Sequence, residues 1–313
     1  MNELDNNDTR PVMVSIQCFV YNHEPFIRKC LDGFIMQETN FRFEAVVHDD
    51  SSTDKSPEII KEYAKKYPHI IIPVLESENL YSRRDGSLEQ AMLPYFRGKY
   101  IAICEGDDYW IDPFKLQKQF DILENDNDIE LCYTRSRVFD NKNQCFQNRI
   151  NADNGPISFE GILLREPTMT LTSFFRASSY FKFLSEECPW GRGWLMGDTP
   201  LFLWLALKGK VVLLQDITAV YRILGESASH SADLQNLFLF NKSTRDIRLY
   251  FCSKYNREDL CSEVCDTYFR SNMSDASRVG NIKYAISNFI KIKKKNRRDY
   301  RRLLLLLKFF FVK

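Results

Sequence analysis

Predicted strands and helices alternate along the first 110 residues, and this alternation restricts the fold more than any other feature of the sequence. Apolar, β-rich runs predict strands at 12–20, 43–50, 70–77 and 99–108. Helical spacing of apolar residues predicts helices at 25–37, 52–68 and 88–97. Because strands joined through helices pair in parallel, we predict a doubly wound, mostly parallel, Rossmann-like α/β sheet. Ligands of such sheets bind beyond the carboxyl ends of the strands.

The rest of the chain extends this α/β pattern and then becomes helical. We expect a polar loop at 140–158 within this part. The other elements that we expect are a helix at 113–126, a strand at 129–139, a helix at 199–209, and strand-like segments at 210–216 and 217–223. The predicted units are an N-terminal tail (1–11), an α/β domain (12–225, divided into 12–113 and 114–225) and a helical region (226–313).

Three carboxylates lie at the end of the strand predicted at 99–108, in the stretch "AICEGDDYWIDP", directly after the apolar residues 100–104. Glu105, Asp107 and Asp108 lie within four positions, where like charges repel one another, so a positive group must offset them. A hard divalent cation that also neutralises nucleotide phosphates has this effect. The structural alternative is a solvated acidic turn in which Asp108 or Asp112 caps the next helix.

A second acidic cluster, "HDDSSTD", begins at the end of the strand predicted at 43–50. A carboxylate here can accept hydrogen bonds from a nucleotide base while Tyr21, at the end of the first strand, stacks on the base. The alternative is that Asp50, Ser51 and Ser52 form an N-cap for the following helix. If both clusters bind ligand, two strand ends build one nucleotide site.

Three ordered motifs resemble those of the family 2 glycosyltransferases, nucleotide-sugar enzymes of the GT-A fold. These motifs are "VSIQCFVYNHEPFIRKCLDGFIMQ", "FEAVVHDDSSTD" and "GKYIAICEGDDYWIDPFKLQKQ" within residues 14–119. The later stretch "GDTPLFLWLALKGKVVLLQDITAVYR" resembles the acceptor-side motif of the family and its closing Tyr-Arg. The combination is more specific than any single motif. It implies a GT-A catalytic domain with a helical C-terminal extension.

The resemblance also implies residues of the donor site. Asp50 matches the carboxylate that reads the base, and Tyr21 matches the position that lies against it. Asp108 is the predicted direct ligand of Mn²⁺ or Mg²⁺, Asp107 lies near the ribose or the metal, and Glu105 replaces the Asp of many relatives. The predicted donor site further includes Asn22, Glu24, Asp49 and Arg222, the last of which can face phosphates.

Asp198 matches the general base of the family. Inverting transfer needs a carboxylate that removes the proton of the acceptor hydroxyl as its oxygen attacks the anomeric carbon. Asp198 before Thr199 and Pro200 also has the form of a helix N-cap. The predicted acceptor contacts are Trp190, Arg192 and Trp194, whose alternative role is to anchor their loop, and His230 is a candidate diphosphate or metal contact.

The C-terminal tail, 291–313, combines eight Lys or Arg between residues 291 and 302 with the apolar run at 303–312. This combination predicts binding to an anionic membrane surface, because basic side chains bind anionic lipid and the apolar run is too short to span a bilayer. Packing on the domain or on a second copy of the chain is the alternative. The net charge of +1 and the absence of a nucleic-acid-binding motif indicate no nucleic-acid partner.

The sequence therefore predicts a metal-dependent, inverting glycosyltransferase. Its donor is a nucleoside-diphosphate sugar, expected to be a UDP-sugar, and its acceptor a saccharide or lipid-linked saccharide in capsule, O-antigen or exopolysaccharide synthesis. The nine scattered cysteines and the polar N-terminus predict a cytoplasmic protein, and the C-terminal tail predicts that it lies at the inner face of the cytoplasmic membrane. The alternatives are a nucleotidyltransferase of similar architecture and a membrane-associated nucleotide-binding protein without activity.

Overall fold

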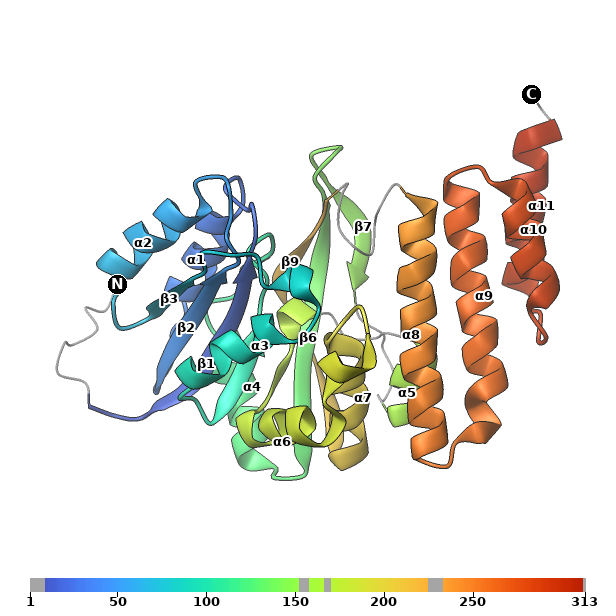
Figure 1. The fold of residues 1–313 in the computed structure, drawn as a ribbon. Coiled ribbons are helices and arrows are strands. Elements are labelled where there is room, and N and C mark those ends of the chain that lie inside the picture. Colours follow the sequence, from blue (N-terminus) through green and yellow to red (C-terminus); the bar gives the residue numbers. More distant parts are fainter. Residues whose placement is uncertain (1–8, 152–157, 166–169, 225–232, 312–313) are drawn as a thin grey trace.

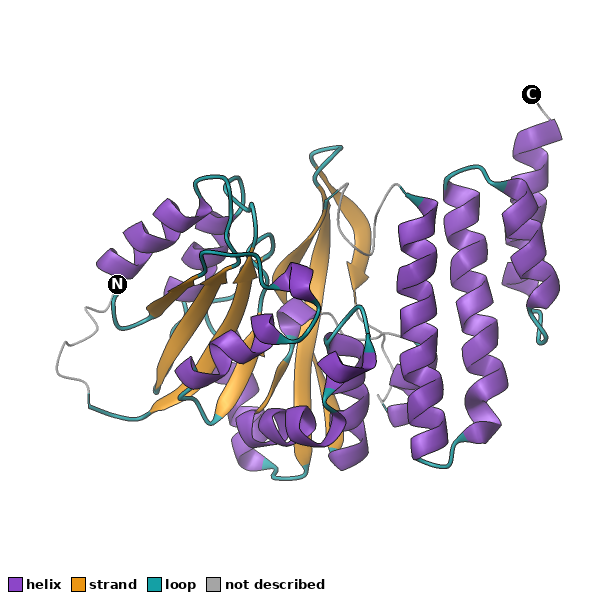
Figure 2. Cartoon of the chain, viewed as in Figure 1, coloured by secondary structure: helices purple, strands orange, loops and turns teal. Residues whose placement is uncertain are grey.

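A computed structural model describes residues 9–151, 158–165, 170–224 and 233–311, with side chains to residue 307. Its strands form one twisted sheet in the order β3-β2-β1-β4-β8-β6-β9-β5, with β7 paired to β6 (Figure 2). The strands are β1 (Val12–Val20), β2 (Arg42–Asp49), β3 (Ile71–Leu75), β4 (Tyr100–Ile103), β5 (Tyr109–Trp110), β6 (Ile129–Asp140), β7 (Cys145–Asn151), β8 (Phe174–Arg176) and β9 (Lys210–Ile223).

The predicted parallel sheet forms the N-terminal half, where β3, β2, β1 and β4 all run in parallel. The second half is mixed, because β8 runs antiparallel to β4 and β6, and β5 runs antiparallel to β9. The segments expected at 210–216 and 217–223 form the single strand β9, which pairs in parallel with β6 through several register shifts. The result is the α/β fold expected from the sequence.

The polar loop predicted over 140–158 is wrong for residues 145–151, which form β7. β7 pairs only with β6 among the described strands, so it lies at an edge, and its side chains are exposed or half-buried. An exposed edge strand needs no alternation of apolar and polar residues, and this segment therefore lacks the usual strand pattern.

Helices cover both faces of the sheet (Figure 1). Side chains of α1, α2 and α4 pack into one core with β1, whereas α5, α6, α7 and α8 pack into a second core around β8. The helices are α1 (Ile27–Ile35), α2 (Ser56–Lys66), α3 (Ser87–Met92), α4 (Lys115–Asn125), α5 (Phe159–Leu164), α6 (Ala177–Glu187), α7 (Asp198–Lys208), α8 (Leu234–Lys254), α9 (Cys261–Arg278), α10 (Ile282–Lys291) and α11 (Arg297–Phe311).

The helical C-terminal region stands at one end of the molecule as a row of packed helices (Figure 1). Its first helix, α8, is part of the second sheet core through Ile247 and Phe251. The later helices have a small core of their own, which includes Met273, Ala285 and Ile292. No helix in the described part of the chain is long and apolar enough to cross a membrane.

A buried carboxylate joins the start of β1 and β2 to the segment before β4. Glu44 is fully buried, and its carboxylate accepts hydrogen bonds from Ser15 Oγ at 2.7 Å and from the Arg97 backbone N at 3.0 Å. Its other oxygen accepts a bond from Arg97 Nε at 2.7 Å. Ser15 Oγ also accepts the Gly98 N–H at 2.9 Å, so the two backbones approach closely at Gly98.

We expect Gly98→Ala to lower the free energy of unfolding by about 1 to 3 kcal/mol, since overpacking has a cost of this size. A Cβ at this position would lie 2.4 Å from the backbone N of Ser15, which cannot move without disturbing β1. Urea denaturation measures the change. Gly161→Ala in α5 is the matched control, because its Cβ would meet nothing closer than 3.8 Å; equal stability of the two variants would contradict the prediction.

Candidate active site

Hydrogen bonds join the loop after β1 to the loop after β2 at the carboxyl edge of the parallel strands. Asn22 adopts a left-handed conformation with φ of 55°. Its Oδ1 accepts the Thr53 N–H at 2.8 Å, and its own N–H donates to Ser52 Oγ at 2.8 Å. Glu24 extends the contact, because its N–H donates to Asp54 Oδ2 at 2.8 Å. Asn22 and Glu24 therefore fix the shape of this edge.

Asp49 and Asp50 are both buried, and they differ in their partners. Asp49 Oδ1 accepts the Ser52 N–H at 2.9 Å. Each oxygen of Asp50 accepts a backbone N–H, from Leu80 at 2.6 Å and from Tyr81 at 3.0 Å. A carboxylate has about four acceptor positions, so Asp50 keeps capacity for a further donor while it holds the 80–81 turn.

Tyr21, which the sequence predicts for the donor site, and Tyr109, which it does not, differ in exposure. Tyr21 is 48% exposed at the end of β1, so its ring is accessible to a planar ligand. Tyr109 follows the acidic loop and is buried, with the Arg222 guanidinium 4.4 Å from its ring centre.

The acidic loop, residues 105–108, packs tightly against the end of β1. Gly106 donates its N–H to the Phe19 carbonyl at 2.9 Å, and a Cβ here would lie 2.8 Å from His23 Nδ1. The Asp108 N–H closes the loop on the Glu105 carbonyl at 3.0 Å. A larger residue at 106 would therefore displace the neighbouring side chains of His23 and Val20.

Arg222, at the end of β9, is the positive group that meets the acidic loop. Its backbone N–H donates to Asp108 Oδ1 at 2.7 Å, and its guanidinium donates to the Asp107 carbonyl. Phe26 and Tyr109 flank the guanidinium, with ring centres at 5.1 and 4.4 Å. Arg222 thus partly supplies the positive charge that the sequence required.

The acidic loop remains rich in negative charge despite Arg222. Burial, followed by repulsion from Asp107, raises the pKa of Glu105 to about 8. The pKa of Asp108 is also raised, by burial first and then by Asp107 and Glu105. These carboxyl groups therefore bind protons readily and favour a further cation nearby.

The acidic loop can bind a divalent cation whose remaining ligands are water and substrate phosphates. Within the described residues, no three His, Cys, Asp or Glu side chains form a metal site by themselves. Mg²⁺ and similar ions usually bind one or two protein carboxylates together with water and substrate phosphates. The oxygen donors of Asp107 and Asp108 fit such a shared site, in which a nucleotide completes the coordination.

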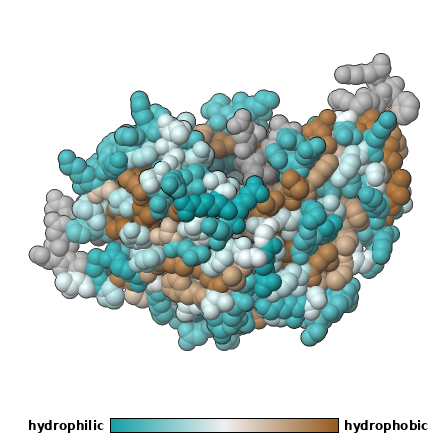
Figure 3. Space-filling view, viewed as in Figure 1, coloured by the Kyte–Doolittle hydropathy of each residue, from teal (hydrophilic) through white to brown (hydrophobic). Residues whose placement is uncertain are grey.

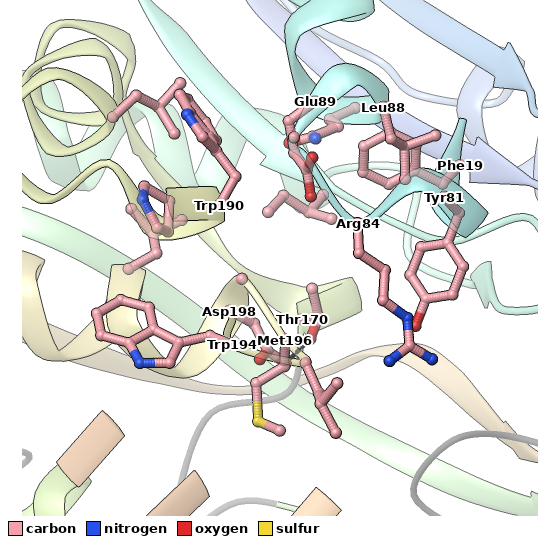
Figure 4. A pocket seen from close by; sticks show the side chains of 18 of the residues that line it. Phe19, Tyr81, Arg84, Leu88, Glu89, Thr170, Trp190, Trp194, Met196 and Asp198 are labelled. Carbon is pink, nitrogen blue, oxygen red and sulfur yellow. Dashed lines mark hydrogen bonds between the residues drawn. The ribbon is translucent and has the colours of Figure 1, made fainter. Parts of the chain in front are cut away.

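A pocket of about 450 Å³ lies next to the acidic loop and contains Asp198 (Figure 4). Asp198 begins α7, and its two oxygens accept bonds from the Thr199 N–H at 2.6 Å and from Thr170 Oγ1 at 3.1 Å. Glu105 lines the same pocket. The structure therefore brings a carboxylate of the acidic loop and the predicted base into one cavity.

The three predicted acceptor contacts separate into two groups. Trp190 and Trp194 line the pocket. Arg192 instead donates through Nε to the Glu187 carbonyl at 2.7 Å, and its guanidinium lies 4.2 Å from the ring centre of Tyr250 in α8. His230 lies outside the described residues.

Several pocket residues have no signal in the sequence patterns. Tyr81, Arg84 and Glu89 enter from the segment between β3 and the end of α3, and Phe240 enters from α8. Their positions depend on contacts between distant segments, so neither periodicity nor the motifs indicate them. The polar turn at 77–87 was the available hint, since loops at strand ends often carry ligand contacts.

Comparison with known proteins identifies a family model and a relative that match this chain. A model described as "Glycosyl transferase family 2" matches residues 15–186. An uncharacterized protein of Mycobacterium tuberculosis is 33% identical over 227 residues, which span 70% of this chain and 61% of that relative.

Two solved structures share the fold at low identity. S. aureus TarS 1–349 in complex with UDP-GlcNAc has a TM-score of 0.54 and 15% identity, covering 96% of this chain and 91% of TarS 1–349. A Pyrobaculum calidifontis mannosyltransferase in complex with GDP-Man and Mn²⁺ has a TM-score of 0.57 and 15% identity, covering 97% and 81% of the two chains.

The raised pKa of Glu105 predicts that the folded chain loses stability as the pH rises toward 8. Its pKa is about 8 in the folded chain against an ordinary value of 4.5. The folded chain therefore binds this proton more tightly, and the stabilisation is complete below about pH 4.5 and lost as the pH rises through about 8. We expect Glu105→Gln, which is neutral at every pH, to raise the melting temperature at pH 8.5 by a few degrees and to change it little at pH 5.

Thermal unfolding at the two pH values, without added metal, measures this effect. Glu58→Gln on the exposed face of α2 is the control, and it should give the same shift at both values. A Glu105→Gln shift that is independent of pH would contradict the assignment.

Proposed function

This chain belongs to glycosyl transferase family 2, and from that premise we propose that it moves a sugar, with inversion, from a nucleoside-diphosphate sugar to a saccharide hydroxyl. The observation that carries the proposal is the shared cavity of Glu105 and Asp198. A donor whose diphosphate lies at the acidic loop has its sugar directed toward Asp198. The acceptor hydroxyl then meets both the sugar and the base.

The donor half of the proposal depends on the edge formed by β1 and β2. Tyr21 offers an accessible ring for the base, and Asp50 offers the acceptor oxygens that a base N–H needs. The solved relatives that bind UDP-GlcNAc and GDP-Man support a nucleoside-diphosphate sugar as the class of donor. We propose a UDP-sugar, because Asp50 can accept the N–H of uracil.

The base half depends on Asp198. Its carboxylate is oriented by the Thr170 hydroxyl and by the Thr199 N–H at the start of α7, which fix the direction of its two oxygens. In transfer, the acceptor hydroxyl gives its proton to Asp198 while the hydroxyl oxygen bonds to the anomeric carbon and the bond to the diphosphate breaks. Charge then develops on the leaving diphosphate.

Asp107, Asp108 and Arg222 surround the position proposed for that diphosphate. Asp107 and Asp108 would hold Mn²⁺ or Mg²⁺, which supplies Lewis-acid stabilisation of the leaving group when it is bound. The Arg222 guanidinium, fixed between Phe26 and Tyr109, adds a second positive charge at the same end. Glu105, at the boundary with the pocket, faces the sugar end.

The acceptor and the cellular location are proposed from the surface of α10 and α11. Ile290, Tyr300, Leu304 and Leu305 are between 52% and 68% exposed, and eight Lys or Arg lie between residues 291 and 302 of the same segment. Apolar and polar patches are mixed at this end of the surface (Figure 3). This mixture supports binding to the anionic inner face of the cytoplasmic membrane and a lipid-linked saccharide acceptor in surface polysaccharide synthesis.

The transfer is tested with a panel of nucleoside-diphosphate sugars, purified protein and Mn²⁺ or Mg²⁺, followed by release of nucleoside diphosphate. We expect release from one donor, and a 10²- to 10⁴-fold lower kcat of saccharide transfer for Asp198→Asn with unchanged donor affinity. Asp121→Asn on the exposed face of α4 is the control. Near wild-type transfer by Asp198→Asn would assign the base to another residue.

The same assay tests the metal and the two alternatives. EDTA and Asp108→Asn should each abolish release. A nucleotidyltransferase would release pyrophosphate instead, and a protein without activity would bind nucleotide without release.

The membrane surface is tested by sedimentation with vesicles of phosphatidylglycerol and phosphatidylethanolamine. Replacing Arg297, Arg298, Arg301 and Arg302 by Gln should weaken binding at least 100-fold, since each basic side chain near anionic lipid contributes about 1 kcal/mol. Replacing Lys61, Lys65 and Lys66 of α2 by Gln is the control and should have little effect. Self-association of the wild type through this surface, with no vesicle binding, would assign it to a homo-oligomer.

A further inference from the structure

A carboxylate that the proposed transfer does not use projects into the pocket. Glu89 extends from α3 into the cavity that holds Asp198, with Trp190 nearby (Figure 4). No hydrogen bond or ion pair from another described residue reaches its carboxylate. Burial, followed by the charges of Asp85 and Asp50, raises its pKa above the ordinary value. A half-buried carboxylate of this kind can accept hydrogen bonds from ligand hydroxyls.

The start of α3 also fixes the position of an aromatic ring beside Glu89. Gly86 has φ of +83°, and a Cβ there would lie 2.4 Å from Cγ of Trp190. The indole therefore packs directly on the backbone that leads to Glu89. Trp194, further along the same wall, is supported from behind by Tyr250 of α8, with ring centres 5.5 Å apart.

Indole rings and a carboxylate together can bind a pyranose, because the sugar has an apolar C–H face and hydroxyl groups that donate hydrogen bonds. The C–H face of the sugar packs on an aromatic ring, and its hydroxyls donate to the carboxylate. Asp198 lies in the same cavity, so a sugar held here can present a hydroxyl to the proposed base.

The charges of the pocket restrict which sugar can bind. The charged side chains among its described lining residues are Glu89, Glu105 and Asp198 against the single guanidinium of Arg84. Even with Glu105 protonated, the two remaining carboxylates outnumber Arg84. A carboxylate or phosphate on the saccharide would therefore meet like charge in a partly desolvated cavity.

We infer that Glu89 and Trp190 form the subsite for an uncharged pyranose of the acceptor, and that Glu89 excludes uronic acids and phosphorylated sugars. This assignment rests on the proposed function, because it places the acceptor beside Asp198. It names Glu89 as a residue that determines acceptor specificity.

The test compares saccharides that differ only at C6. Saturation-transfer NMR of the full chain, without donor, measures binding of the methyl glycosides of glucose and galactose against those of glucuronic and galacturonic acid at pH 7.5. We expect a neutral glycoside to bind at least about tenfold more tightly than its uronic acid counterpart. Glu89→Gln should reduce that ratio below about threefold, and Glu89→Arg should reverse it.

Glu186→Gln is the matched control, since this carboxylate lies on α6 near Lys182 and Lys208 and does not line the pocket. It should keep the wild-type ratio. Equal binding of neutral and acidic glycosides by the wild type, no binding of any of the four, or an unchanged ratio in folded Glu89→Gln would each overturn the inference.

Release of nucleoside diphosphate by the wild type distinguishes failure of the proposed sugar transfer from failure of the proposed acceptor subsite. Release without selective glycoside binding would contradict the assignment of the subsite and would still support the proposed transfer. Selective binding without release from any donor removes the transfer, and with it the acceptor role of the subsite.

Discussion

The contact between Arg222 and the acidic loop is the interaction on which the site depends. Asp108 is buried, and its carboxylate is held by the backbone N–H of Arg222 at 2.7 Å. The antiparallel pairing of β5 with β9 creates this contact, because it places Tyr109 opposite Val220, two residues before Arg222. The end of β9 is thereby brought to the carboxyl end of β4, and the two halves of the sheet share one edge.

The C-terminal helices contribute to the catalytic unit through α8. Glu187 is fully buried and accepts bonds from Tyr250 at 2.9 Å and Lys254 at 2.6 Å, both in α8. The Leu195 N–H donates to Ser243 Oγ at 2.9 Å, also in α8. These bonds fix the segment that carries Trp190 and Trp194. The wall of the pocket therefore depends on a helix that the sequence assigned to a separate region.

Much of the fold could be read from short-range patterns. The strands β1 to β4 and the helices α1, α2 and α4 are confirmed. β1, β2 and β4 could be read as continuous apolar runs, which are buried almost throughout, and the helices could be read from apolar residues at helical spacing. β7 could not be read, since an exposed edge strand carries no such pattern. Asp50, Asp108 and Asp198 were predicted from motifs that combine several residues, whereas Glu89, which lines the pocket, belongs to no motif and was not predicted.

The sequence by itself determined which carboxylates follow the parallel strands, because the strand period and the motif spacing are local properties of the chain. It also determined the family. Only the tertiary structure decided that Arg222 meets Asp108, that Arg192 faces α8, and that Glu89 shares a cavity with Asp198. These residue pairs are separated by more than 50 positions. Their proximity follows from sheet order and helix packing, which arise from the combined burial of many side chains and from no single segment.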